Sequence, residues 1–219
     1  MPSPTVEDYV RAVYALGLES TDGAASVTRL AATLGVTRGS VSAMVRKLKE
    51  AKLAKAEPYG GVRLTAKGRR LALDVVRRHR LIEVFLVEKL GLDWSEVHEE
   101  AHRLEHSISA KVLDRLDAYL GHPTSDPHGA PIPDANGKLQ QATLTPLAEL
   151  SKNDRAVVAR VSDQSPEFLE FAAAHGLRPG TPIRVTAVDG PARTLTVRAK
   201  GRSPVSLSLD AARSIQVEV

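Results

Sequence analysis

Histidines and carboxylates are concentrated in one stretch in the first half of the 219-residue chain. His98, His102 and His106 follow one another at intervals of four residues, and the earlier His79 stands four residues before Glu83. On a helix, side chains four residues apart lie on one face, so such a pair can offer two ligands to one metal ion. The chain has no cysteine, so only nitrogen and oxygen donors are available. This donor set suits divalent manganese, iron, cobalt, nickel or zinc.

The same stretch contains the string His-Glu-Glu-Ala-His at residues 98–102, which matches the H-E-x-x-H pattern of zinc proteases. In those enzymes the glutamate acts as a general base in an open cleft, whereas here the string lies in an acidic helical segment. The chain has no Ser-His-Asp string, glycine-rich phosphate loop or dinucleotide fingerprint. We therefore expect a metal-binding protein that is not an enzyme, with a metallohydrolase and a metal buffer as the alternatives.

Two helices are expected to carry these ligands. Apolar residues recur at helical spacing over residues 66–90, and Gly91 is suited to end that helix. Asp93 and Glu96 have the three-residue spacing of a capping box, which predicts a second helix from there to about Tyr119. The ligands are therefore expected on two adjacent helices.

The N-terminal segment has the pattern of a helix-turn-helix followed by a hairpin wing. A helix is expected from Thr5, and a short one around Leu30. After a glycine-containing turn, a third helix over residues 38–51 has apolar residues on one face and small or basic residues on the other. A helix that enters the DNA major groove needs such a face. Short β stretches on either side of residues 58–61 predict the wing, and a winged helix that contacts only proteins is the alternative.

Charge supports DNA binding by this segment, because residues 1–72 carry a net charge of +6, residues 73–145 of −4 and residues 146–219 of +2. The expected contacts to phosphates or bases are Thr37, Arg38, Ser40, Ser42, Arg46, Lys47, Tyr59 and Arg63. The third helix has no Asn or Gln for direct adenine recognition. Methyl contacts and DNA shape are therefore expected to contribute to specificity.

The chain changes character after a proline-rich linker at residues 122–137. Short β stretches separated by Gly and Pro turns begin near Ala142, with one helical piece at residues 166–175. The expected strands are residues 156–161, 182–188, 194–198, 206–209 and 215–219. The fold class is therefore a mainly α N-terminal two-thirds followed by a small β-barrel. The expected domains are residues 1–72, 73–143 and 144–219.

Composition narrows the function classes. Hydrophobic residues at 42% and charged residues at 26% are typical of a globular protein, whereas aromatic residues at 4% are too few for stacking on single-stranded nucleic acid. No apolar run is long enough to cross a bilayer, and the first residues lack the pattern of a signal peptide. We expect a cytoplasmic protein with neither a membrane partner nor a small organic substrate.

These motifs together resemble the diphtheria toxin repressor family of metal-dependent transcription regulators over nearly the whole chain. The stretches that carry the resemblance, besides the helix-turn-helix, are residues 7–9, 78–83, 97–106 and 122–133. The resemblance implies a homodimer that pairs through the middle helices, binds a palindromic operator when metal is present and represses metal-uptake genes. It also implies that the C-terminal domain is an SH3-like, FeoA-like domain.

The resemblance assigns two metal sites. The primary, activating site maps to Asp8, His102, Glu105 and His106. The ancillary site maps to His79, Glu83 and His98, with Gln164 and Glu167 as candidate ligands from the C-terminal domain.

The primary set favours manganese, with iron as the alternative. Asp8 is a hard oxygen donor, whereas His102 is a borderline nitrogen donor that neither the iron-responsive nor the manganese-responsive branch has at this position. Arg11 stands where one manganese branch has a carboxylate, which argues against a two-metal cluster at the primary site. Other divalent metals are expected to substitute in vitro. Histidines bind metal when neutral, so the metal response should weaken as the pH falls toward about 6.

Overall fold

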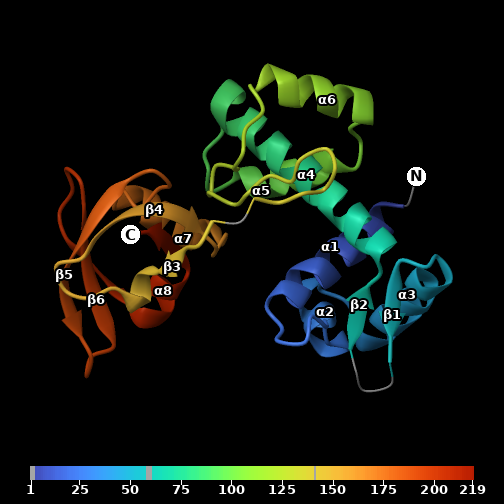
Figure 1. Ribbon diagram of the computed structural model, residues 1–219, viewed down its shortest axis with the longest axis horizontal. Helices are drawn as coiled ribbons and strands as arrows, with labels where there is room; N and C mark the ends of the chain where they lie inside the picture. Colours follow the sequence, from blue (N-terminus) through green and yellow to red (C-terminus); the bar gives the residue numbers. More distant parts are fainter. Residues whose placement is uncertain (1–2, 58–60, 141) are drawn as a thin grey trace. The chain divides into compact units, whose positions relative to one another are not determined.

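The computed structural model describes residues 3–57, 61–140 and 142–219 (Figure 1). The chain forms two compact units, one of Met1–Arg78 with Pro133–Lys138 and the other of His79–Ile132 with Leu139–Val219. The long helix α4 spans Ala66–Leu90, so its first half belongs to one unit and its second half to the other. It has the bounds that the apolar periodicity predicts, and Gly91 follows it with a φ of 71°.

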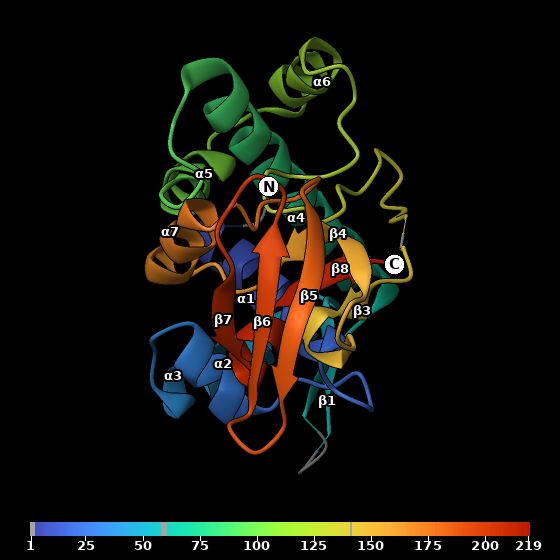
Figure 2. The same ribbon diagram turned by 90° about the vertical axis from the view of Figure 1, so that its left-hand side faces the viewer.

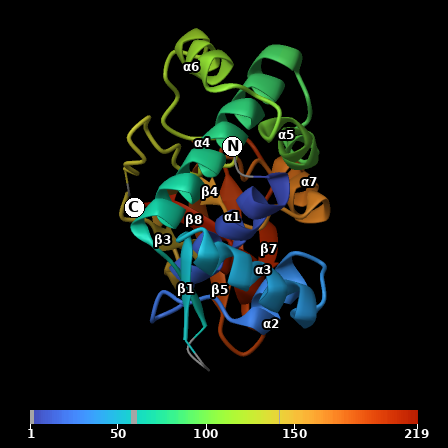
Figure 3. The same ribbon diagram turned by 90° about the vertical axis from the view of Figure 1, so that its right-hand side faces the viewer.

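The first unit contains the predicted winged helix-turn-helix (Figure 3). Its elements before α4 are α1 Pro4–Leu18, α2 Val27–Thr33, α3 Arg38–Glu50, β1 Ala54–Ala56 and β2 Val62–Leu64. Thr37 begins α3 by accepting a hydrogen bond from the Ser40 amide at 3.1 Å. Strands β1 and β2 pair antiparallel as the wing. The apolar faces of these elements form one core around Val10, Leu30 and Leu48.

The prediction of a single helix ending near Tyr119 is wrong for the helical part of the second unit. Two helices, α5 Val97–Glu105 and α6 Ala110–Tyr119, replace it. The chain breaks between them because Ser109 caps α6, accepting a hydrogen bond from the Val112 amide at 3.3 Å. The break lets α6 pack Leu113 into the small core beside α4.

The expected capping box before α5 is also wrong. Asp93 instead accepts hydrogen bonds from the amide and hydroxyl of Ser95, at 2.9 and 2.7 Å. The side chain of Glu96 forms no capping hydrogen bond, although this residue directly precedes α5. The aspartate therefore closes a local turn of its own, and the helix begins later than the spacing predicts.

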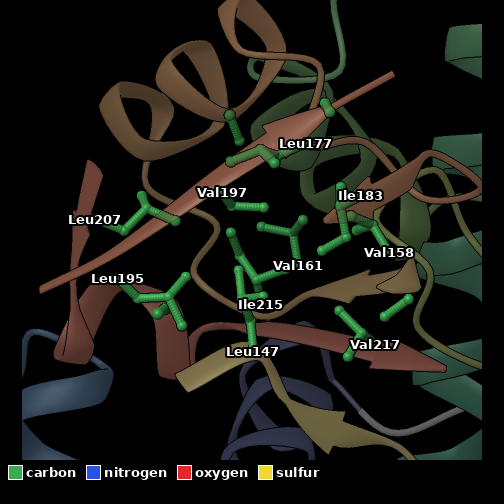
Figure 4. Packing of buried hydrophobic residues seen from close by; sticks show 14 of the residues in the cluster. Leu147, Val158, Val161, Leu177, Ile183, Leu195, Val197, Leu207, Ile215 and Val217 are labelled. Carbon is green, nitrogen blue, oxygen red and sulfur yellow. The ribbon is translucent and has the colours of Figure 1, made fainter. Parts of the chain in front are cut away.

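The β part of the second unit is the predicted C-terminal domain (Figure 2). Its elements are β3 Thr145–Pro146, the 3-10 helix Leu147–Glu149, β4 Arg155–Val161, α7 Pro166–Ala174, β5 Pro182–Asp189, β6 Thr194–Ala199, β7 Val205–Ser208, α8 Leu209–Arg213 and β8 Ile215–Glu218. The antiparallel sheet has the order β3-β8-β4-β5-β6-β7 and is open at its two end strands. Alternate residues such as Val158, Val197 and Ile215 point into one apolar core (Figure 4).

Candidate metal centre and nucleic-acid interface

Helices α4 and α5 bring three of the predicted ancillary ligands together in the second unit. The Nε2 atom of His79 lies 2.9 Å from Glu83 Oε1 and 3.0 Å from His98 Nδ1. His98 Nδ1 is in turn 3.2 Å from the same Glu83 oxygen. His79 and Glu83 are buried, whereas the His98 side chain is 38% exposed. Two imidazoles and a carboxylate at these distances form a donor set for a divalent cation.

Hydrogen bonds control the protonation of this set. Burial disfavours the charged form of His79, but hydrogen bonds with Glu105 and Glu83 outweigh burial and raise the pKa of His79 to about 9. Burial likewise opposes ionisation of Glu83, but hydrogen bonds with His79 and His98 hold the pKa of Glu83 far below its usual range. The metal-free set therefore holds a proton on His79, and a divalent cation can replace that proton.

Glu105 connects the ancillary set to three predicted primary ligands. Its carboxylate is fully buried, and its Oε2 atom lies 2.7 Å from His79 Nδ1. Its Oε1 atom lies 2.9 Å from His102 Nδ1 and 3.4 Å from His106 Nε2. His106 is the residue directly after α5, so the end of this helix still presents His102 and His106 to one point, with ring centres 5.5 Å apart. One carboxylate thus faces imidazoles of both sets.

The other predicted ligands have different locations. Asp8 lies on α1 of the first unit, so its approach to the three ligands on α5 stays a prediction. Gln164 is half-buried in the loop before α7, and Glu167 is exposed in the first turn of that helix. Among the described residues, no group of three or more potential His, Asp or Glu ligands includes Glu167. The parts of Gln164 and Glu167 in the ancillary site also stay predictions.

Sequence reasoning missed two further groups. Asp126 and His128, in the proline-rich linker, meet Glu83 as a third set of potential ligands, all three of them buried. The signal was the run Asp-Pro-His-Gly, because an aspartate followed by proline and glycine is typical of a tight turn that can orient side chains.

The second group is an ion pair in the first unit. Arg78 binds buried Glu7 through both carboxylate oxygens, at 2.8 and 3.2 Å.

The recognition helix α3 presents the predicted DNA-binding face. Its outward residues Ser40, Ser42, Arg46 and Lys47 are all exposed, while Val41 is buried. The hydroxyls of the first two are held locally, since Ser40 Oγ is 2.9 Å from Thr37 Oγ1 and Ser42 Oγ donates to the Arg38 carbonyl. Within the described ranges no carboxylate forms an ion pair with Arg38, Arg46 or Lys47. Their charges are therefore available to phosphates.

In the wing, one of the two predicted DNA-binding residues already has a partner within the protein. Arg63 already binds Asp22, donating through Nη2 to Oδ2 at 2.7 Å and through Nε to the backbone carbonyl at 3.1 Å. A phosphate contact would have to compete with this pair. The predicted contact at Tyr59 lies outside the described residues.

Comparison with known proteins agrees with this organisation. The chain matches the iron dependent repressor N-terminal DNA binding domain at residues 1–62, the iron dependent repressor metal binding and dimerisation domain at residues 65–134, and the FeoA domain at residues 145–219. These matches support the helical DNA-binding and metal-binding regions and the SH3-like C-terminal domain. The finer boundaries after residues 72 and 143 stay predictions.

Whole-chain relatives agree as well. The iron-dependent repressor IdeR of Mycobacterium leprae is 32% identical over 98% of this chain and 96% of its own length. The diphtheria toxin repressor of Corynebacterium jeikeium is 33% identical over 84% of this chain and 86% of its own length. A solved structure described as a manganese-dependent transcriptional repressor in complex with manganese is 38% identical, with a TM-score of 0.89 and coverage of 97% of this chain and 99% of that one.

The fold and the ligand sets therefore define a metal-dependent transcriptional repressor with a winged-helix DNA-binding region. The chain belongs to the iron-dependent repressor family, to which the diphtheria toxin repressor gives its common name. Its relatives are transcriptional repressors and not enzymes, as predicted. None of the helices in the described part of the chain has the length and apolar character of a membrane span.

Proposed function

We propose that a divalent metal ion activates this repressor by joining Asp8 of the first unit to His102, Glu105 and His106 of the second. The observation that supports the proposal is the buried Glu105 carboxylate, whose Oε1 atom faces both His102 and His106. Three donors from one helix end leave coordination positions open for a ligand from elsewhere. A metal held by both units would limit the positions of the recognition helices in a dimer and favour the spacing of two operator half-sites.

The His79, Glu83 and His98 set is proposed as the ancillary metal site, with Gln164 and Glu167 as further ligands from the C-terminal domain. Burial and the short distances among its three core members support this role. We expect this site to bind metal without deciding DNA binding, because its core lies within a single unit.

Manganese is the proposed physiological metal, and ferrous iron is the alternative. The combination of carboxylate and imidazole donors, without a thiol, supports a hard or borderline cation. One similar structure is described as a complex with manganese, whereas the curated relative from Mycobacterium leprae is described as iron-dependent.

The functional unit is proposed to be a homodimer on a palindromic operator. Large apolar side chains on the helices of the second unit are exposed, and a second copy would cover them. They are Leu90, Leu104, Val112 and Tyr119. Each α3 helix would then enter one major groove, with Arg38, Arg46 and Lys47 toward phosphates or bases. The proposed targets are metal-uptake genes, and the proposed location of the protein is the cytoplasm.

A mobility-shift titration tests the proposed function. The full chain is titrated onto DNA from upstream of its own gene and of neighbouring transporter genes, with manganese, ferrous iron, zinc or a chelator. We expect a shift that requires metal, is strongest with manganese and is lost in His106→Ala. His122→Ala is the matched control, because this exposed histidine pairs with Asp117 away from the ligand sets. Binding in chelator equal to that in metal would contradict the switch.

A further inference from the structure

A third group of donor atoms shares Glu83 with the ancillary set, in which Glu83 uses its Oε1 atom. It consists of Glu83, Asp126 and His128, and one donor atom of each lies within 4.8 Å of the other two. Three side-chain atoms here are inaccessible to solvent and form no hydrogen bond within the described part of the chain, namely Glu83 Oε2, Asp126 Oδ2 and His128 Nδ1. Buried polar atoms without partners are rare in folded proteins, and three in one place call for an explanation.

The linker turn holds the Asp126 carboxylate in place. Its Oδ1 atom accepts hydrogen bonds from the amides of His128 and Ala130, both at 2.9 Å. The other oxygen, Oδ2, forms no hydrogen bond among the described residues and lies 3.4 Å from Nε of the Arg80 guanidinium. The turn thus fixes the carboxylate through one oxygen and leaves the second to face the group.

His128 is fixed in the tautomer that a metal ligand needs. Its Nε2 atom lies 2.8 Å from the carbonyl oxygen of Trp94, and its ring stacks on the Trp94 ring with centres 5.3 Å apart. A carbonyl can only accept, so Nε2 carries a proton and Nδ1 is the ring nitrogen left to bind a metal ion. Metal-binding histidines are typically oriented by such a hydrogen bond on the far nitrogen.

One water molecule does not satisfy this group when His128 is neutral. The three orphaned atoms are acceptors, whereas one water donates only two hydrogen bonds. A cation, in contrast, accepts all three lone pairs at once.

We propose that Glu83 bridges two neighbouring divalent-cation sites, with Oε1 facing His79 and His98 and Oε2 facing Asp126 and His128. Two carboxylate oxygens and one imidazole suit manganese or ferrous iron at the second site. The bridge rests on the proposed ancillary site, whereas the cation at Asp126 and His128 stands on its own geometry.

The second site would also tie the helices of the second unit to its sheet. The His128 carbonyl accepts a hydrogen bond from the Val161 amide of β4 at 2.9 Å. Gly129 follows with a φ of 85°, and a Cβ atom there would lie 1.9 Å from the Ala159 carbonyl oxygen. The ligand-bearing turn is therefore pressed against β4, so a cation held by Asp126 and His128 would strengthen this contact.

Manganese binding to the full chain tests the proposal. Equilibrium dialysis gives the number of ions bound per chain, and electron paramagnetic resonance reports whether two manganese ions are magnetically coupled through a bridging carboxylate. The test variant is Asp126→Asn, which keeps the Oδ1 acceptor and removes only the Oδ2 ligand. We expect it to bind one equivalent less manganese than the wild type and to lose the coupled signal.

Asp134→Asn is a closely matched control. Asp134 makes the same kind of turn, accepting hydrogen bonds from the amides of Asn136 and Lys138 at 2.8 Å, but it is exposed and belongs to no ligand set. It should bind manganese as the wild type does. If Asp126→Asn disturbs folding, His128→Gln removes the nitrogen ligand instead and should cause the same loss.

The two proposals fail in different ways. Equal stoichiometry in Asp126→Asn, His128→Gln and the wild type would overturn the second site. A lost equivalent in Asp126→Asn without any coupled signal in the wild type would overturn the bridge. In His98→Gln, the coupled signal should disappear while the equivalent that depends on Asp126 remains. Operator binding that depends on manganese should survive in Asp126→Asn. A wild-type chain without manganese-dependent operator binding would instead contradict the proposed function.

Discussion

The two ligand sets on α4 and α5 differ in how completely one unit supplies them. His79, Glu83 and His98 are already within hydrogen-bond distance of one another, and two of the three are buried. The other set has one buried member, Glu105, while the His102 side chain is 42% exposed. Burial does not separate the sets, because His98 is 38% exposed and His106 only 13%. We call the first set, which one unit supplies, the enclosed set, and the second, which needs a ligand from the other unit, the open set.

This difference distinguishes a site that only binds metal from a site whose occupancy changes DNA binding. A complete site inside one unit can bind an ion without changing the relation between units, so its occupancy alone carries little information to DNA. An incomplete site binds tightly only when another element adds its ligand, and metal binding is then coupled to that arrangement. Glu105 belongs to both sets through its two oxygens, so the sets are expected to influence each other.

Replacing Glu105 is expected to have the largest effect, because it removes the charge that both sets share. In Glu105→Gln, the imidazoles of His79, His102 and His106 lose their common carboxylate while the side-chain volume is kept. We predict that the gain in operator affinity caused by manganese, about 5- to 150-fold for a typical allosteric coupling, disappears. The measurement is an operator titration with and without manganese.

Glu100→Gln is the matched control for this prediction. Glu100 lies on the same helix, but its side chain is 45% exposed, and its contact is an ion pair with Arg103 at 2.7 Å. Such surface pairs contribute at most about 1 kcal/mol to stability. A manganese response in Glu105→Gln as large as in Glu100→Gln would show that the shared carboxylate is not needed.

A change of pH is expected to have a smaller effect on metal affinity. This effect concerns the enclosed set, because that set contains His79. Because the pKa of His79 is raised to about 9, metal-free protein carries this proton at neutral pH and must release it on binding metal. Metal affinity should therefore rise by about tenfold per pH unit below pH 9 for this one proton. Calorimetry in buffers of different ionisation enthalpy measures the release, which His79→Gln should abolish.

The same raised pKa sets the sign of a stability change. The charged His79 stabilises the metal-free fold at low pH, and this contribution is lost as the pH rises through about 9. Metal-loaded protein has no such proton to lose. Thermal melts of the metal-free chain that do not change between pH 7 and pH 10 would contradict the assignment.

Much of the fold could be predicted from the sequence, because its signals are local. The apolar period of α4 and the turn at Gly91 both depend on neighbouring residues and are confirmed. The break between α5 and α6 was missed. Ser109 caps α6 locally, but the packing of Leu113 beside Leu81 and Val84 of α4 is a contact between distant segments, which local spacing does not reveal.

Prediction of the ligand sets was limited in the same way, because only local spacing could be used. His102 and His106 could be paired from their spacing of four residues, and the structure brings their ring centres to 5.5 Å. His98 instead contacts His79 of α4. Asp126 and His128 could not be placed, because they reach Glu83 only through the path of an irregular linker more than forty residues away in sequence. Likewise, spacing gave no reason to expect that Arg63 would be held by Asp22.

We propose that the open set, completed by Asp8, switches DNA binding while the enclosed set does not. The most direct test compares Asp8→Asn with His98→Gln in one measurement, the ratio of operator dissociation constants without and with manganese. We predict that Asp8→Asn reduces this ratio to about one, while His98→Gln keeps most of the wild-type response. A full manganese response in Asp8→Asn together with a lost response in His98→Gln would contradict this proposal and assign the switch to the enclosed set.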